Sequence, residues 1–144
     1  MNIVKEYKSN LIRLENILGT TSTDSEQLYR VGKFIFDNNN IFVGVFPSDK
    51  VPTLKNNQCC LLNTDDSEHK GIHWCSLYRY NNNYYFNDSY NRDYKLLSKH
   101  WKTKKWINAN KDVDQAYTEE DCGPRSMAWL ISFNKWNTKI INVI

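Results

Sequence analysis

Residues 115–129 read QAYTEEDCGPRSMAW, and this stretch places one cysteine, Cys122, at the expected start of a helix. Met127 and Leu130 follow at helical spacing, and Pro124 falls in the first turn, where its missing N–H costs nothing. The unpaired N–H groups and the positive dipole end of a helix N-terminus favour a thiolate over a thiol. Cys122 is therefore our candidate nucleophile, although a buried cysteine that merely begins a core helix would show the same local pattern.

The chain has 144 residues and a formal net charge of +3, which fits one domain (1–144) with a mild basic bias. No run approaches the ~20 apolar residues that span a bilayer, and the first ten residues, MNIVKEYKSN, lack the apolar core of a secretory signal. Two of the four cysteines, Cys59 and Cys60, are adjacent, unlike the disulfide framework of a small secreted domain. We therefore expect a reducing, intracellular setting and no membrane partner.

Helical periodicity predicts two helices in the first part of the chain. Apolar residues recur at helical spacing over 4–18, and Gly19 ends that segment. Polar residues follow, with Thr23 or Asp24 as a capping residue, and predict a second helix that runs to about Phe36.

Four runs that are short and apolar, or that alternate in polarity, predict strands at 41–46, 58–63, 72–80 and 84–88. The asparagines between the last two predict a turn, so these two strands should form an antiparallel hairpin. The two-residue period of a strand puts His73 and Cys75 on one face of the hairpin and Trp74 on the other, with Asp88 on the partner strand.

The basic and aromatic segment 89–112 then predicts a short helix at about 94–100 and a strand at about 105–109, before the Cys122 helix. This order of elements indicates an α+β domain. We expect a mostly antiparallel central sheet flanked by helices, with the nucleophile at the N-terminus of a helix.

Acyl transfer by a cysteine needs a thiolate, a histidine that pairs with it and later protonates the leaving amine, a group that orients the histidine, and oxyanion donors. The chain offers a candidate for each role. Cys122 is the nucleophile, His73 is the base and Asp88 orients the imidazole. A side-chain N–H of Gln115 can join the backbone N–H of Cys122 at the oxyanion, because a loop of a few residues can fold it over the helix start.

The motifs that carry these residues resemble a known family. GIHW at 71–74, FNDS at 86–89, Gln115 and DCG at 121–123 match, in order and spacing, the His, acid, Gln and Cys of the ubiquitin-like protease clan of cysteine peptidases. Within that clan, the chain is most similar to the adenovirus maturation proteases (adenains). The likeness covers about 24–133, and the full order of motifs is more specific than any one of them.

The resemblance implies a cysteine endopeptidase with a Cys-His-Asp triad, built on a protease core at 24–144. An extra N-terminal helix in 1–23 would either pack on that core or dock elsewhere. The implied substrates are viral capsid or core precursor proteins that are cleaved during virion maturation. The implied source is a small DNA virus or virophage, and the implied location is the virion and the host cell interior (virus factory or nucleus), without secretion.

The chain departs from the adenovirus enzymes at the acid. Those enzymes use Glu, whereas this sequence has Asn87 followed by Asp88. The SUMO-specific proteases use Asp followed by Ser, as in Asp88-Ser89, which favours Asp88. A shift of one residue in register would instead offer Asn87, which can orient a histidine but carries no charge.

The proposed chemistry requires no cofactor, but the resemblance implies DNA or a short viral peptide as an activator. The run KHWKTKKW at 99–106 could stack Trp101 and Trp106 on bases. Its lysines could meet phosphates: Lys99, Lys102, Lys104 and Lys105. An ordinary solvated basic face, with both tryptophans in the core, is the alternative that we favour, because the net charge is small.

Three other functions stay open. Proteases of ubiquitin-like modifiers use the same constellation, so a deubiquitinase or deSUMOylase is the main alternative. A zinc site built from Cys59, Cys60, His69, His73 and Cys75 is disfavoured, because adjacent cysteines on a strand point to opposite faces and a Cys-x-x-Cys pair is absent. A catalytically silent DNA-binding domain would keep the fold and leave the four chemical roles unused.

Overall fold

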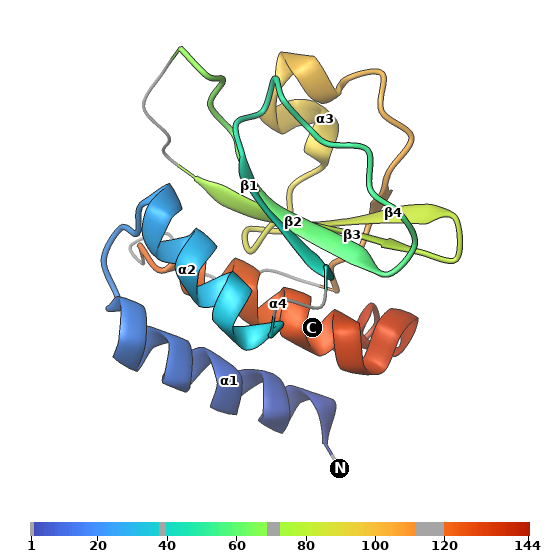
Figure 1. The fold of residues 1–144 in the computed structure, drawn as a ribbon. Helices are drawn as coiled ribbons and strands as arrows, with labels where there is room; N and C mark the ends of the chain where they lie inside the picture. Colours follow the sequence, from blue (N-terminus) through green and yellow to red (C-terminus); the bar gives the residue numbers. More distant parts are fainter. Residues whose placement is uncertain (1, 38–39, 69–72, 112–119) are drawn as a thin grey trace.

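The computed structural model describes residues 2–37, 40–68, 73–111 and 120–144, and the structural statements below concern these residues. The fold is α+β (Figure 1). The helices are α1 (Ile3–Leu18), α2 (Ser25–Ile35), α3 (Tyr94–Leu97) and α4 (Cys122–Trp136), with short 3-10 helices η1 (Lys99–Trp101) and η2 (Asn137–Ile140). The strands are β1 (Phe42–Phe46), β2 (Gln58–Asn63), β3 (Trp74–Tyr80), β4 (Asn83–Asn87) and β5 (Ile107–Asn108).

The helices α1 and α2 begin and end where the sequence indicates, whereas the helix predicted at about 94–100 is divided into α3 and η1 by Ser98, whose backbone is extended. Asp24 is the N-cap of α2, and its side chain exchanges hydrogen bonds with Gln27 in a capping box. Gly19 ends α1 with a φ of 84°, a conformation that glycine adopts without strain. Cys122 is the first residue of α4, and Pro124 lies in its first turn.

The five-stranded sheet has the order β1-β2-β3-β4-β5 and is mixed. The strands β2, β3 and β4 pair antiparallel, but β1 is parallel to β2 and β5 is parallel to β4. The prediction of a mostly antiparallel sheet therefore holds only for the central three strands. The reason is the path of two connections: both 47–57 and 88–106 return over the same face of the sheet before the next strand begins (Figure 1).

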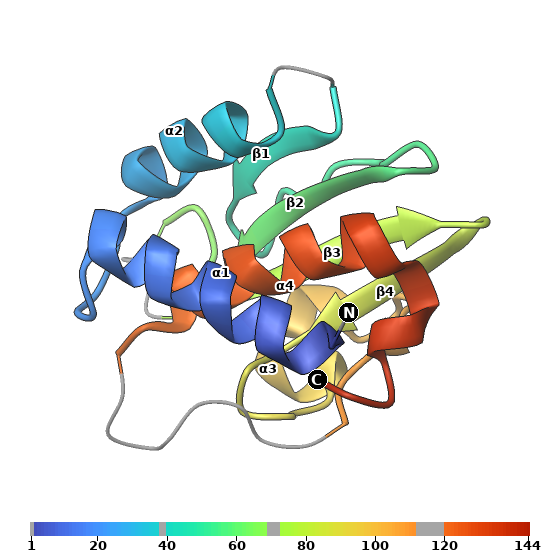
Figure 2. The ribbon, with the colours of Figure 1, turned by 90° about the horizontal axis from the view of Figure 1, so that it is seen from below.

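Each face of the sheet covers a separate core. On one face, α2 and α4 pack against the strands, and α1 lies along α4 on the side away from the sheet (Figure 2). Trp129 and Phe133 of α4 are central to this core, and Tyr7 and Leu14 attach α1 to it. On the opposite face, α3 and the two returning connections enclose a second core around Trp101.

The position of α1 answers the question that the sequence left open about residues 1–23. This helix packs along α4 through its apolar face, and Lys135 Nζ lies 2.6 Å from Glu6 Oε1 across the same contact. The helix is thus part of the domain that carries Cys122. Among the described residues, we find no helix with both the length and the apolarity to cross a membrane.

Candidate active site

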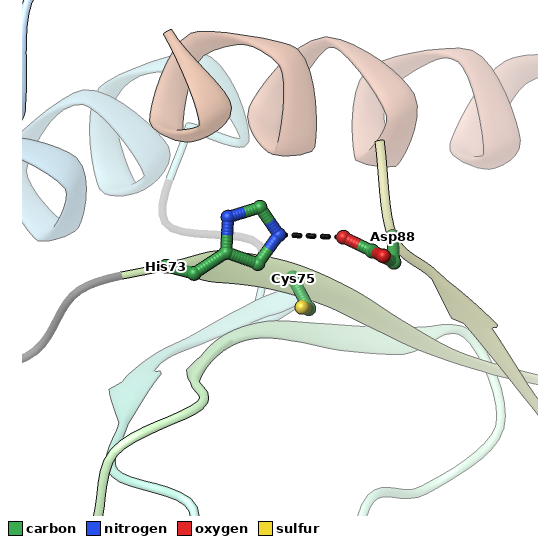
Figure 3. A group of neighbouring side chains, drawn as sticks. All are labelled: His73, Cys75 and Asp88. Atoms are coloured by element: carbon green, nitrogen blue, oxygen red, sulfur yellow. Dashed lines mark hydrogen bonds and ion pairs between the residues drawn. The ribbon is translucent and has the colours of Figure 1, made fainter. Parts of the chain in front are cut away.

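The candidate site lies at the end of the hairpin where β3 begins and β4 ends, beside the start of α4. His73 directly precedes β3, and Asp88 directly follows β4. Because the two strands are antiparallel and their last paired residues are Ser76 and Asn87, these two side chains emerge at the same edge. Figure 3 shows the imidazole of His73 directed at the carboxylate of Asp88.

His73 and Asp88 form a short, buried hydrogen bond. His73 Nε2 lies 2.5 Å from Asp88 Oδ1, and the two residues are 8% and 0% exposed. Burial opposes the charge of the imidazolium, but hydrogen bonds to Asp88, Cys122 and Cys75 outweigh it and raise the pKa of His73 well above its ordinary value. The contact therefore favours an imidazolium paired with a carboxylate over a neutral pair.

Asp88 is fixed through both its backbone and its side chain. Asn110 donates from Nδ2 to the carbonyl of Asp88 at 2.6 Å and accepts from the amide of Asp88 at 3.2 Å. Arg92 donates from Nε to Asp88 Oδ2 at 2.7 Å. Burial would raise the pKa of Asp88, but the bonds from His73 and Arg92 lower it to about 2. Asp88, and not its neighbour Asn87, is thus the residue that contacts the imidazole.

Cys122 stands at the N-terminus of α4, close to His73. The thiol is 8% exposed, and its hydrogen bond with His73 is one of the contacts that raise the pKa of the imidazole. Nε2 is engaged by Asp88, and Figure 3 shows the other ring nitrogen, Nδ1, on the side away from Asp88. The side chain of the N-cap residue Asp121 makes no capping bond and instead accepts from Arg125 Nε at 2.9 Å, and Cys122 lies at the positive end of the helix dipole.

Two buried hydroxyls tie α4 to β3 and so set the distance from Cys122 to His73. Ser76 Oγ donates to the carbonyl of Ser126 at 2.8 Å, and Ser126 Oγ donates to the carbonyl of Trp74 at 3.0 Å. Both bonds lie within a few residues of the thiol and the imidazole.

Gly123 lets the start of α4 approach the residues that precede α2. A Cβ at this position would lie 2.1 Å from Thr23 Oγ1 and 3.2 Å from Leu28 Cδ2. The carbonyl of Thr23 in turn accepts from the indole N–H of Trp74 at 3.0 Å. The glycine of the Cys-Gly pair is therefore required by a close contact next to the nucleophile.

A metal site is the alternative use of this cluster, because the potential ligand atoms of His73, Cys75 and Asp88 lie within 4.8 Å of one another (Figure 3). The donor set does not suit a cation. Both oxygens of Asp88 accept hydrogen bonds, one of them from a guanidinium, and burial raises the pKa of the Cys75 thiol to about 11. Cys59 and Cys60 face opposite cores, as the sequence predicts, so they cannot complete one site.

The structure brings together three of the four predicted site residues: His73, Asp88 and Cys122. Gln115 and His69 lie outside the described residues. Sequence reasoning did not find Arg92, Asn110 or the two serines. A basic residue four positions after the acid was visible in the sequence, but its contact with Asp88 depends on the turn between them.

The basic segment has its tryptophans in the second core. Trp101 is fully buried and donates its indole N–H to the carbonyl of Ser48 at 2.9 Å, and Trp106 packs against it with ring centroids 5.5 Å apart. Trp101 thus lies in the second core, as the alternative that we favoured predicts, and Trp106 is half-buried beside it. The lysines of the segment are exposed except for Lys104, which is half-buried.

A scan against protein-family models finds no match to this chain, and a search of curated proteins also finds none.

Proposed function

We propose that the protein is a cysteine endopeptidase with Cys122 as the nucleophile, His73 as the general base and acid, and Asp88 as the group that orients the imidazole. One observation carries the proposal: a buried imidazole hydrogen-bonds a buried carboxylate, and the thiol at the N-terminus of α4 is also among its hydrogen-bond partners. Each contact suits the Cys-His-acid arrangement of nucleophilic catalysis.

In the proposed reaction, the thiolate of Cys122 attacks the carbonyl carbon of the scissile amide. The negative oxygen that forms is stabilised by the backbone N–H of Cys122 at the start of α4, and we assign a second donor to Gln115. The His73 imidazolium protonates the leaving amine as the C–N bond breaks, which leaves a thioester on Cys122. His73 then removes a proton from water, the resulting hydroxide attacks the thioester, and the acid product and the thiol are released.

The hydrogen bond with Asp88 supports both proton transfers. It fixes the orientation of the ring, and it stabilises the positive imidazole that each step requires. Because Asp88 has no exposed surface, water does not weaken this interaction.

We assign the protein, by the likeness of its motifs, to the adenovirus maturation proteases within the ubiquitin-like protease clan. The α+β fold with the nucleophile at a helix N-terminus supports this assignment. The proposed substrates are viral capsid or core precursors in the virion or the infected cell, with DNA or a peptide as an activator. Proteases of ubiquitin-like modifiers are the alternative. Cleavage of peptides from capsid or core precursors would support the first function, and release of a fluorophore from the C-terminus of a ubiquitin-like protein would support the second.

Thiol labelling tests the proposed chemistry before a substrate is known. The folded protein is treated with iodoacetamide from pH 5 to 9, and mass spectrometry locates the label in the native protein, in His73→Ala and in the control His100→Ala. We expect Cys122 to react far faster than the other cysteines below pH ~7, and we expect only the His73 change to remove this advantage.

Differences in exposure can explain why Cys122 reacts faster than the other cysteines, but they cannot explain a dependence of its rate on His73. The other three cysteines are fully buried and would react slowly in any case, so selectivity for Cys122 is not sufficient. The decisive result is the dependence on His73 at low pH. If His73→Ala and His100→Ala label Cys122 with the same pH profile as the native protein, the thiol is not activated and the proposal fails.

A further inference from the structure

We propose that Arg92 is a positioning residue of this site, which fixes the Asp88 carboxylate opposite His73 and holds Tyr90 against the imidazole. This inference rests on the proposed function, and it assigns a role to the turn 88–92 that follows β4. Arg92 contacts neither the thiol nor a substrate in this role, because it acts through Asp88 and Tyr90.

The backbone of the turn brings Arg92 back to Asp88. The amide of Asn91 donates to the carbonyl of Asp88 at 2.8 Å, and Asn91 has a φ of 56°, in the left-handed region that asparagine tolerates. The amide of Arg92 then donates to Asp88 Oδ2 at 3.1 Å. The carboxylate therefore organises the turn that carries its own cationic partner.

The guanidinium of Arg92 contacts the buried Asp88 carboxylate, which solvent does not reach. Its Nε donates to Oδ2 at 2.7 Å, and its Nη2 lies 3.4 Å from Oδ1, the oxygen that His73 contacts. The Asp88 side chain is fully buried, whereas the Arg92 side chain remains 43% exposed. Because both carboxylate oxygens are engaged from different directions, the carboxylate cannot rotate away from His73 without breaking a charged hydrogen bond.

Tyr90 closes the arrangement on the other side of the imidazole. Its ring stacks on His73 with centroids 5.3 Å apart and planes 30° apart, and the guanidinium carbon of Arg92 lies 4.9 Å from the Tyr90 ring centre. Arg92 thus contacts two of the groups that touch His73, namely Asp88 and Tyr90. The side chains of His73, Asp88, Arg92 and Tyr90 therefore form a ring of contacts that restrains the imidazole.

The consequence is a defined dependence on pH. Among the described residues, the titratable groups that face Asp88 are His73 from the start of β3, Cys75 from β3 and Arg92 from the turn, and Cys122 acts through His73. An opposite charge this close lowers a carboxyl pKa by about 1–3 units. Without Arg92, Asp88 should accept a proton at a higher pH, and Cys122 should lose its reactivity at a higher pH as well.

The test compares Arg92→Met, Arg92→Lys and the matched control Arg30→Met. Arg30 Nη2 pairs with Glu26 Oε1 at 2.6 Å and at the same spacing of four residues, but that pair is exposed. Two readouts are followed in each variant: the iodoacetamide rate of Cys122 as a function of pH, and the titration of the Asp88 carboxyl carbon by NMR.

We expect Arg92→Met to raise the pH of the Asp88 carboxyl inflection and of the acid limb of Cys122 reactivity by about one unit or more. Below both inflections, this corresponds to about a tenfold slower labelling rate for each unit. Arg92→Lys should lie between Arg92→Met and the native protein, because lysine supplies the charge without the two-pronged contact. Arg30→Met should match the native protein.

Superimposable Asp88 titrations and Cys122 profiles for Arg92→Met and the native protein would overturn the inference. If Arg92→Met does not fold, Arg92→Lys carries the test, and its superposition on the native profiles would have the same meaning. Failure of the proposed function looks different. In that case native Cys122 shows no activated reactivity, while the Asp88 titration still reports whether Arg92 sets the state of the carboxylate.

Discussion

Replacing Asp88 with asparagine should lower the stability of the protein at neutral pH and remove part of its sensitivity to acid. Burial opposes the carboxylate, but His73 and Arg92 hold its pKa at about 2, against an ordinary value of 3.8. At 1.36 kcal/mol per pH unit, this interval corresponds to about 2.5 kcal/mol of stability at pH 7. Since the pKa is lower in the folded state, the stabilisation is nearly complete above pH ~4, about half remains at pH 3, and it is lost as the pH falls through ~2.

Urea unfolding of the native protein and of Asp88→Asn at pH 7, 4 and 3 measures this difference. We expect the variant to be less stable by about 2–3 kcal/mol at pH 7 and by about half as much at pH 3. Glu26→Gln is the matched control, because its ion pair with Arg30 has the same spacing but lies in solvent. That change should cost less than about 1 kcal/mol.

Two results would refute this reasoning. A loss below about 1 kcal/mol at pH 7 would mean that the contacts of His73 and Arg92 do not stabilise the Asp88 carboxylate beyond an exposed pair. A larger loss that stays constant from pH 7 to pH 3 would mean that packing, and not charge, accounts for the effect of Asp88→Asn. Equal unfolding slopes for the two proteins are needed for the comparison.

Three further substitutions test the packing around the site and the roles of α1 and of the basic segment. Gly123→Ala should lower the free energy of unfolding in urea by about 1–3 kcal/mol and slow the labelling of Cys122, because the new Cβ would meet Thr23. Adding Thr23→Ala should restore part of the stability and part of the labelling rate. If the stability losses of the two substitutions simply add, the close contact is contradicted. Leu11→Ala should lower the free energy of unfolding by about 2–4 kcal/mol, and the protein should still unfold in a single cooperative transition in urea. A separate, earlier transition for α1 would contradict the packing of α1 as part of the domain. Trp101→Phe should lower the free energy of unfolding by about 1–3 kcal/mol, because the carbonyl of Ser48 loses the buried indole N–H that donates to it. Any affinity for DNA, measured by fluorescence anisotropy, should stay unchanged. Weaker DNA binding by the folded variant would indicate that Trp101 stacks on bases.

The elements of the fold could be predicted from the sequence where the local signal is strong. The capping box at Asp24 and the glycine at 19 set the bounds of the first two helices, and the asparagines at 81–83 set the hairpin turn. The direction of β1 relative to β2 could not be predicted in this way. It depends on the path of 47–57 over the sheet, which Leu54 fixes by entering the second core.

The candidate residues of the site could be predicted because the chemistry of each role requires a particular type of side chain. The residues that hold them in place could not be predicted. Whether Asp88 or Asn87 meets the imidazole depends on a register of one residue, which reverses the face of a strand. The role of Arg92 depends on the turn at Asn91, and that of Asn110 depends on how the chain passes β4 after β5. The oxyanion role of Gln115 stays a prediction.

The construction of the site implies which of its parts can respond to a substrate. Ser76 and Ser126 join α4 to the first residues of β3, and these two buried hydrogen bonds would both break if Cys122 moved away from His73. Leaving such groups unpaired costs about 1–3 kcal/mol each, so the thiol and the imidazole are held by rigid elements. In the turn 88–92, by contrast, the Arg92 side chain that contacts Asp88 remains 43% exposed. A substrate that alters the site should therefore act first on the exposed Arg92 side chain, and through it on the ionisation of Asp88, before it changes the distance between the reacting groups.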